Sequence, residues 1–341
     1  MKPPLRIALI LVGAVVWALA TSAASAQTIM GAGSSFAYPI YQKWFDAYHK
    51  LHPDVNFNYQ PNGSGAGIAQ YQSGVVDFGA TDAPLTDAQL AASGRPTAQI
   101  PTVSGCIAMS YNLPNVRSGL RLSGSVIAEI YLGEIKQWND KRIAALNPLI
   151  PLPNLPIVVA HRADSSGTTY VFTNYLASVS PEWKAKVGAA KSVNWPVGLG
   201  GNQNPGVAGI IKGSPGGFGY VELAYILQTH LPAATVENGS GNFVFPSVSS
   251  TALAVSAAAP QLKKDLRALT VSAPGMNTYP IVGLTYLLVP TNSPKPGVTA
   301  AMRAFLTWAM ADGQQLAPSL AYAPLPPNVA TANLKTIGAT K

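Results

Sequence analysis

The fold and the chemistry of this chain are decided by one stretch, His161-Arg-Ala-Asp-Ser-Ser-Gly-Thr-Thr169. The segment before it, Pro156 to Ala160, is short, apolar and rich in β-branched residues, which predicts a buried strand. After it, apolar residues recur at helical spacing from Val171 to Leu176. The stretch is therefore expected to be a turn between a strand and a helix.

This turn carries the groups that hold an anion. An arginine, several hydroxyls and the free backbone N–H groups of a helix start would converge there. Helix N-termini carry unpaired donors and a partial positive charge, so phosphate, sulfate or carboxylate binds there readily, and arginine adds a planar set of donors. The plainer alternative is a helix cap beside an Arg–Asp pair on the surface. The stretch alone leaves both interpretations open.

The N-terminus predicts an export signal. Lys2 and Arg6 precede an apolar run from Ile7 to Ala20, and the segment closes with Ala24-Ser-Ala26. A cleavage site of this type makes Gln27 the first residue of the mature chain. A membrane anchor is the alternative, but a span needs about 18 to 20 apolar residues and this run is shorter. We therefore expect a soluble, exported protein.

Composition narrows the class of protein further. The chain has 341 residues, more than one core usually holds, so two lobes are expected. Its net charge is +8, but the basic residues are scattered and form no block of the kind that binds nucleic acid. The excess charge is either an aid to capturing a small anion or generic surface charge. The single cysteine, Cys106, can form no intramolecular disulfide, and its apolar neighbours favour a buried, inert thiol.

Strand-to-helix units repeat along the first part of the chain. Strands are expected over Thr28–Met30, Val55–Gln60 and Val75–Ala80, each followed by a turn rich in glycine or hydroxyls. Repeated units of this kind imply an α/β fold with mainly parallel sheets, where ligands collect at the strand ends. A buried strand over Ile281–Val289 would return to the first lobe. The last 20 residues, rich in proline and alanine, are expected to wrap over the surface.

Five motifs together resemble one family, the periplasmic phosphate-binding proteins of phosphate ABC transporters. They run in order from about Met30 to about Pro326, and they are Gly31–Pro39, Val76–Pro84, Arg162–Thr168, Trp195–Gly201 and Gly217–Glu222. The resemblance implies a two-lobed, class II periplasmic binding fold with the ligand in the hinge cleft. It also implies high-affinity binding of inorganic phosphate and its delivery to an ABC-type membrane permease by a monomeric protein.

The same resemblance suggests bounds for the parts of the chain. Residues 1–26 would be the signal peptide, 27–104 with 283–341 the first lobe, and 105–282 the second lobe. A strand-like run from Cys106 to Tyr111 would cross between the two lobes.

The ligand set is likewise what the resemblance implies. It places phosphate against eight residues: Ser35, Phe36, Ser64, Asp82, Arg162, Ser166, Gly167 and Thr168. Phe36 would contribute its backbone N–H, and Asp164 would orient the arginine. The chain departs from the family pattern at Ser35, where threonine is common, and over Asn62–Ala66, where Gly-Ser-Ser-Gly-Gly is usual. A hydroxyl is kept at both places.

The chemistry of Asp82 supports a protonated ligand independently. A carboxylate that faces a bound anion is repulsive at low dielectric unless the ligand brings a proton. Phosphate keeps a proton near pH 7, as arsenate does, whereas sulfate and molybdate do not. A site built around such a donor can reject an analogue that lacks it by about 10⁴- to 10⁵-fold. The alternative is that Asp82 caps the next helix, a role that Thr86 already fills in a Thr86–Gln89 capping box.

A secreted phosphatase is the alternative from another class of protein. A nucleophilic serine needs a base within reach, and His161 is the histidine nearest to the motif. On a strand, His161 and Arg162 point to opposite faces, so the imidazole is expected to face away from the site. His49-x-x-His52 has no further ligands nearby to complete a zinc site. We therefore expect no catalytic residue, no metal, no cofactor and no nucleic-acid partner.

Overall fold

The computed structural model describes residues 27–340, so the predicted signal over residues 1–26 lies outside the described part of the chain. One large sheet holds eight strands, in the order β2 (Val55–Gln60), β1 (Gln27–Gly33), β3 (Phe78–Thr81), β11 (Val282–Pro290), β4 (Thr97–Tyr111), β8 (Gly217–Glu222), β6 (Val158–Arg162) and β7 (Leu199–Gly201). A small sheet has the order β10 (Phe243–Val244), β9 (Thr235–Glu237) and β5 (Arg121–Leu122). The predicted α/β fold is confirmed.

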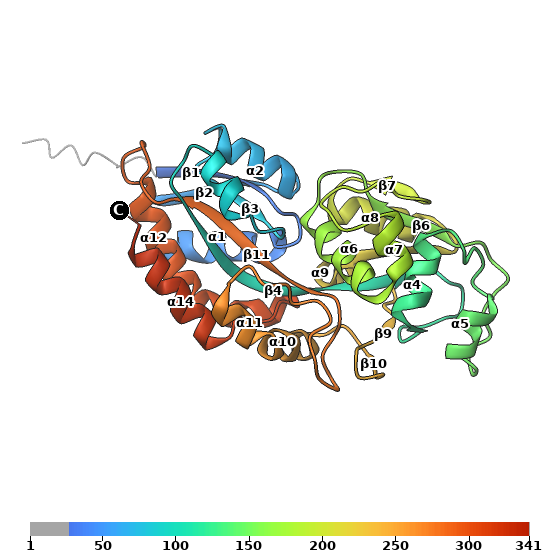
Figure 1. Cartoon of the computed structure of the whole chain (residues 1–341). Coiled ribbons are helices and arrows are strands. Elements are labelled where there is room, and N and C mark those ends of the chain that lie inside the picture. Colours follow the sequence, from blue (N-terminus) through green and yellow to red (C-terminus); the bar gives the residue numbers. More distant parts are fainter. Residues whose placement is uncertain (1–26, 341) are drawn as a thin grey trace, which may run out of the picture.

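The outer strands of the large sheet are parallel and the two middle strands are antiparallel to their neighbours. β1 pairs in parallel with β2 and β3, and β6 pairs in parallel with β7 and β8. β4 pairs with β11 as far as Cys106 and with β8 from Ile107 onward, both times antiparallel. β4 therefore runs from one half of the sheet into the other, as Figure 1 shows.

Figure 1 shows two groups of elements on either side of this crossing, which we call the first and second lobes. The first lobe contains β1, β2, β3 and β11 with the helices α1 (Tyr38–Leu51), α2 (Ser64–Gln72), α3 (Asp87–Ala92), α12 (Val298–Ala309), α13 (Asp312–Leu316) and α14 (Pro327–Gly338). The second contains β6, β7 and β8 with α4 (Gly124–Tyr131), α5 (Lys141–Leu146), α6 (Gly167–Val179), α7 (Pro181–Lys186), α8 (Gln203–Gly213) and α9 (Leu223–Thr229). The residue bounds given for the lobes above stay a prediction.

Two further helices, α10 (Val248–Ala257) and α11 (Ala259–Lys264), and a 3₁₀ turn, η1 (Ala317–Leu320), complete the described elements. None of the helices among residues 27–340 is long and apolar enough to cross a membrane.

Aromatic side chains fill the core of the first lobe. The ring of Phe57 on β2 lies 4.6 Å from the rings of both Phe45 on α1 and Phe305 on α12. On the other face of the sheet, Gly67 of α2 approaches β1 so closely that a Cβ there would lie 2.3 Å from the Cα of Gly33. This contact holds the start of α2 against the end of β1.

In the second lobe, side chains of successive β8 residues pack against helices on opposite faces of the sheet. The ring of Tyr220 stacks 4.3 Å from Phe172 of α6. The next residue back, Gly219, faces α8, because a Cβ there would lie 2.8 Å from a side-chain carbon of Ile211. Successive residues of a strand point to opposite faces, so this pair fixes which helix covers which side.

The expectation that the last 20 residues wrap over the surface is wrong. Most of them form α14, whose Val329, Asn333 and Ile337 are buried at four-residue spacing. The Asn333 side-chain amide donates to the carbonyl of Pro101 in β4 at 2.6 Å. The polar Asn333 interrupts the apolar pattern, so the amphipathic face was not evident in the sequence.

We predict that α14 contributes to the stability of the first lobe. Ile337→Ala removes a fully buried side chain and should lower the free energy of unfolding by about 2–5 kcal/mol. Leu334→Ala in the same helix removes a side chain that is 42% exposed and should change it by less than about 1 kcal/mol. Urea unfolding of the two variants measures the difference. Equal effects would show that α14 is not docked as described.

Candidate functional site

Arg162, the last residue of β6, is buried and held in a fixed direction. Its guanidinium donates to both carboxylate oxygens of Asp164 and, from Nη1, to the Thr168 hydroxyl at 3.2 Å. Burial raises the pKa of Asp164, but the hydrogen bonds and charge of Arg162 outweigh it and leave that pKa below its ordinary value. Arg162 is only 3% exposed, so this is not the surface ion pair considered above.

The start of α6 follows directly. Ser166 is its N-cap, and the Ser166 hydroxyl accepts from the backbone N–H of Thr169 at 3.0 Å. The backbone N–H of Gly167, the first residue of α6, donates to the Ser64 hydroxyl in the first lobe at 3.1 Å. The helix cap and the anion site are therefore not exclusive, because the capped turn still directs backbone donors toward the other lobe.

The turn after β1 brings Ser35 and Phe36 to the same place. Gly33 is required there: its φ is +138°, and a Cβ would lie 2.0 Å from the carbonyl oxygen of Ala80. The Ser35 hydroxyl accepts from the backbone N–H of Asn204 at 3.3 Å and from its side-chain amide at 3.1 Å. Phe36 is fully buried beside it.

Ser64, the first residue of α2, lies between the lobes. Its hydroxyl accepts from the backbone N–H groups of Asp82, at 3.2 Å, and of Gly167, at 3.1 Å. The preceding Gly63 has a φ of +96°, and a Cβ there would lie 2.3 Å from the Asp164 carboxylate. The first-lobe turn therefore approaches the arginine pair with no room for a side chain.

Asp82 follows β3 and is 3% exposed. Its Oδ1 accepts from two hydroxyls, Ser34 Oγ at 2.6 Å and Thr285 Oγ1 at 2.7 Å. Its Oδ2 faces α6, since a Cβ on Gly167 would lie 2.4 Å from it. Burial raises the pKa of Asp82 to about 6, and the hydroxyls of Ser34, Thr285 and Ser64 and the charge of Arg162 lower it in part. The carboxylate is thus strongly desolvated, with one oxygen saturated and the other directed across the cleft.

Asn204, near the start of α8, was not among the predicted site residues. Its side-chain amide donates to the Thr168 hydroxyl and to the Ser35 hydroxyl, both at 3.1 Å, and its oxygen accepts from the backbone N–H of Glu222 at 3.0 Å. It therefore joins hydroxyls of the two lobes.

Tyrosines and a buried carboxyl support the turn that carries Ser35. The Tyr225 hydroxyl donates to the Ser35 carbonyl at 2.6 Å. The Tyr322 hydroxyl lies 2.5 Å from the Phe36 carbonyl and 3.1 Å from Oε2 of Glu222. Burial raises the pKa of Glu222 well above its ordinary value, and the hydrogen bonds from the Ala224 backbone N–H and from Tyr322 lower it in part. These contacts tie the turn to the second lobe.

The structure brings the eight predicted ligand residues into two hydrogen-bonded networks and their borders. One network runs from Ser35 through Asn204 and Thr168 to Arg162. The other runs from Asp82 through Ser64 to Gly167. Phe36 and Ser166 adjoin these networks without being part of them. The Phe36 carbonyl accepts from the Tyr322 hydroxyl, and the Ser166 hydroxyl accepts from the backbone N–H of Thr169.

Three contributors were missed: Ser34, Thr285 and Asn204. Ser34 adjoins Ser35 in the first motif, and nothing in the sequence separates the roles of the two serines. Thr285 is a hydroxyl inside an otherwise apolar strand, which was the available signal for a buried polar contact. Asn204 follows a glycine-rich loop at the start of α8, and its sequence context carried no such signal.

His161 lies on the opposite face of β6 from Arg162. Its ring stacks on Trp195 with centroids 4.8 Å apart, and its Nδ1 is 3.0 Å from the Arg162 carbonyl. Among residues 27–340 the structure also contains no group of three or more histidine, cysteine or acidic side chains placed to hold a metal ion.

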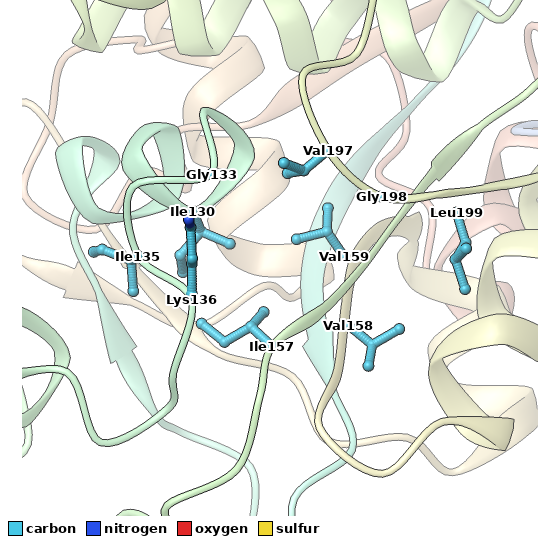
Figure 2. Close-up of a pocket in the computed structure, with 10 residues that line it drawn as sticks. All are labelled: Ile130, Gly133, Ile135, Lys136, Ile157, Val158, Val159, Val197, Gly198 and Leu199. Carbon is cyan, nitrogen blue, oxygen red and sulfur yellow. The ribbon is translucent and has the colours of Figure 1, made fainter.

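A separate cavity of about 370 Å³ lies outside both networks (Figure 2). It is lined mainly by apolar residues of α4 and the loop after it, of β6 and the residue before it, and of the start of β7 and the loop before it: Ile130, Gly133, Ile135, Lys136, Ile157, Val158, Val159, Val197, Gly198 and Leu199. Lys136 is the one charged residue in this lining, and none of the predicted ligand residues contributes to it. The predicted ligand residues therefore lie away from this cavity.

Comparisons with known proteins agree with the resemblance. A family model described as a PBP superfamily domain matches residues 18–312. The phosphate-binding protein PstS of Haemophilus influenzae is 43% identical over 307 residues, covering 90% of this chain and 91% of that protein. PstS of Pasteurella multocida is 42% identical over 305 residues, covering 89% and 88%.

A solved structure of the phosphate-binding protein from Stenotrophomonas maltophilia superposes with a TM-score of 0.69 at 19% identity, covering 91% of this chain and 93% of that one. This likeness shows a shared fold, and the predicted two-lobed binding-protein architecture is confirmed.

The pKa of Asp82 predicts a pH-dependent stability in the ligand-free chain. Because folding raises this pKa from 3.8 to about 6, the contribution to stability is complete below pH 3.8 and is lost as the pH rises through about 6. The Asp82→Asn side chain has no proton to lose. Its free energy of unfolding should therefore rise relative to that of the parent by up to about 3 kcal/mol across that pH range, and the difference should persist at higher pH. Unfolding of both proteins at a series of pH values measures this, and a pH-independent difference would contradict it.

Proposed function

Because the chain belongs to the PBP superfamily and, within it, to the family of phosphate-binding proteins named PstS, we propose that it binds inorganic phosphate and delivers it to an ABC-type membrane permease. The observation that carries the proposal is that a group of hydrogen-bond donors in the second lobe faces one buried carboxylate in the first lobe. Arg162 and the start of α6 attract an anion, whereas Asp82 accepts only an anion that still carries a proton.

The proposed ligand set is the one implied by the resemblance. Hydroxyls of Ser35, Ser64, Ser166 and Thr168, the N–H groups of Phe36 and Gly167, and the Arg162 guanidinium would donate to phosphate oxygens. Oδ2 of Asp82 would accept the ligand's proton. Asp164 would keep Arg162 oriented, as its two-point ion pair supports. All these groups lie at strand ends, in the turns that follow them, or at helix starts of the two lobes.

The arrangement also supports closure of the two lobes around the ligand. Ser64 contacts Gly167, and Ser35 contacts Asn204, so that first-lobe hydroxyls reach second-lobe donors in the present conformation. Residues 27–104 with 283–341 and residues 105–282 are the proposed moving parts. The chain is proposed to act as a monomer in the periplasm after removal of residues 1–26, and it is proposed not to be an enzyme.

Titration calorimetry of the mature chain with phosphate and sulfate tests the proposal. Phosphate should bind tightly at pH 7 and sulfate at least about 10⁴-fold more weakly. Asp82→Asn replaces the acceptor with an amide that can donate, so the gap between the two anions should narrow. An arsenate titration belongs in the same series, because arsenate shares the protonation of phosphate.

Two outcomes would contradict the proposal. The first is no binding of phosphate, or equal affinity for sulfate, in the parent chain. The second is release of product from a phosphate ester that disappears in Ser166→Ala, which would assign a secreted phosphatase instead.

A further inference from the structure

We propose that Thr285 is a specificity-determining residue: together with Ser34 it saturates Oδ1 of Asp82, so that Oδ2 is the oxygen left to accept a ligand's proton. The inference rests on the proposed function. It assigns selectivity to a residue on β11, outside the turns and helix starts that carry the proposed ligand set.

The position of Thr285 depends on an irregularity between the two crossing strands. The β4–β11 register shifts between Thr285 and Tyr286, which pair with Val103 and Pro101, so that Thr102 is the extra residue on β4. The Thr102 hydroxyl donates to the Thr285 carbonyl at 3.0 Å. A bulge re-aims nearby side chains, and here the fully buried Thr285 hydroxyl meets Asp82 at 2.7 Å.

The two hydroxyls stabilise the ionised carboxylate without adding charge. Arg162 is the cation that acts on Asp82, and it is already bonded to Asp164. Arg267 and Tyr170 line the small cavity that Asp82 borders, and Arg267 is bonded to Asp87 and Asp265. The other titratable groups that interact with Asp82 are acids of α1, β2, β8, α9, β11 and the segment after η1: Tyr41, Tyr59, Glu222, Tyr225, Tyr286 and Tyr322. Neutral donors on Oδ1 therefore favour ionisation while the site stays repulsive to an anion without a proton.

Loss of one hydroxyl should change which anion is accepted. With fewer donors on Oδ1, Asp82 would hold its own proton to higher pH, because a hydrogen bond to the charged form has been removed. A protonated Asp82 is a donor, and a donor can bind sulfate. Selectivity should then fall mainly because sulfate gains affinity.

The test measures phosphate and sulfate affinities by calorimetry from about pH 5 to about pH 9 for the parent, Thr285→Val, Thr285→Ser and Ser34→Ala. In Thr285→Val the phosphate-to-sulfate ratio at pH 7 should fall about 10- to 100-fold, as expected for one hydrogen bond to a charged group. Sulfate binding should also persist to about one pH unit higher than in the parent. Thr285→Ser restores the hydroxyl and should recover most of the ratio.

Each outcome decides the inference. An unchanged ratio in a folded Thr285→Val overturns it, and so does an equal loss in Thr285→Ser, which would mean that packing and not the hydroxyl matters. If Thr285→Val does not fold, Ser34→Ala decides, because it removes the other donor to the same oxygen. Thr291→Val, which removes a hydroxyl just beyond β11, controls for loss of a threonine hydroxyl. Failure of the parent to bind phosphate refutes the proposed function itself, whereas a selective parent with an equally selective Thr285→Val refutes this inference alone.

Discussion

The site depends on a buried carboxylate that lacks a cation of its own. Arg162 is bonded through two nitrogens to Asp164, so the charge of that pair is balanced before Asp82 is counted. Oδ1 of Asp82 accepts hydrogen bonds from the hydroxyls of Ser34 and Thr285 and none from a cation, and the Asp82 backbone N–H donates to the Ser64 hydroxyl. The three charged groups sum to one negative charge in a cleft rich in donors. Such a cleft suits an anion that carries a proton, which is the chemistry of the proposed phosphate ligand.

The fold brings these groups together by its long crossing strands. β4 pairs with β11 as far as Cys106 and with β8 from Ile107, so both lobes share one continuous sheet. β11 returns beside it and carries Thr285 to Asp82. The hydrogen bonds between the lobes, Gly167 to Ser64 and Asn204 to Ser35, therefore lie at the ends of strands and helices and not in their interiors. Tyr322, which is bonded to Glu222, also contacts the Phe36 carbonyl, so the region that joins the lobes also positions the turn that carries Ser35.

The sequence was informative where chemistry and local pattern coincide. Arg162, Ser64 and Asp82 stand beside predicted strand ends or glycine turns, and the structure places them there. Thr285 and Asn204 could not be assigned, because their partners Asp82 and Ser35 lie 203 and 169 positions away, and only the fold sets them opposite. Tertiary packing likewise decided the C-terminus, where a buried polar residue hid the helical face.

In the proposed mechanism, the ligand's proton, received by Asp82, decides which anion is accepted. Neutron crystallography of the phosphate complex, grown in heavy water near neutral pH, observes that proton most directly. We expect one deuterium between a phosphate oxygen and Oδ2 of Asp82, with the hydroxyl deuterons of Ser34 and Thr285 pointing at Oδ1. A phosphate that faces Asp82 with no deuterium between them, or one that does not contact Asp82, would contradict it.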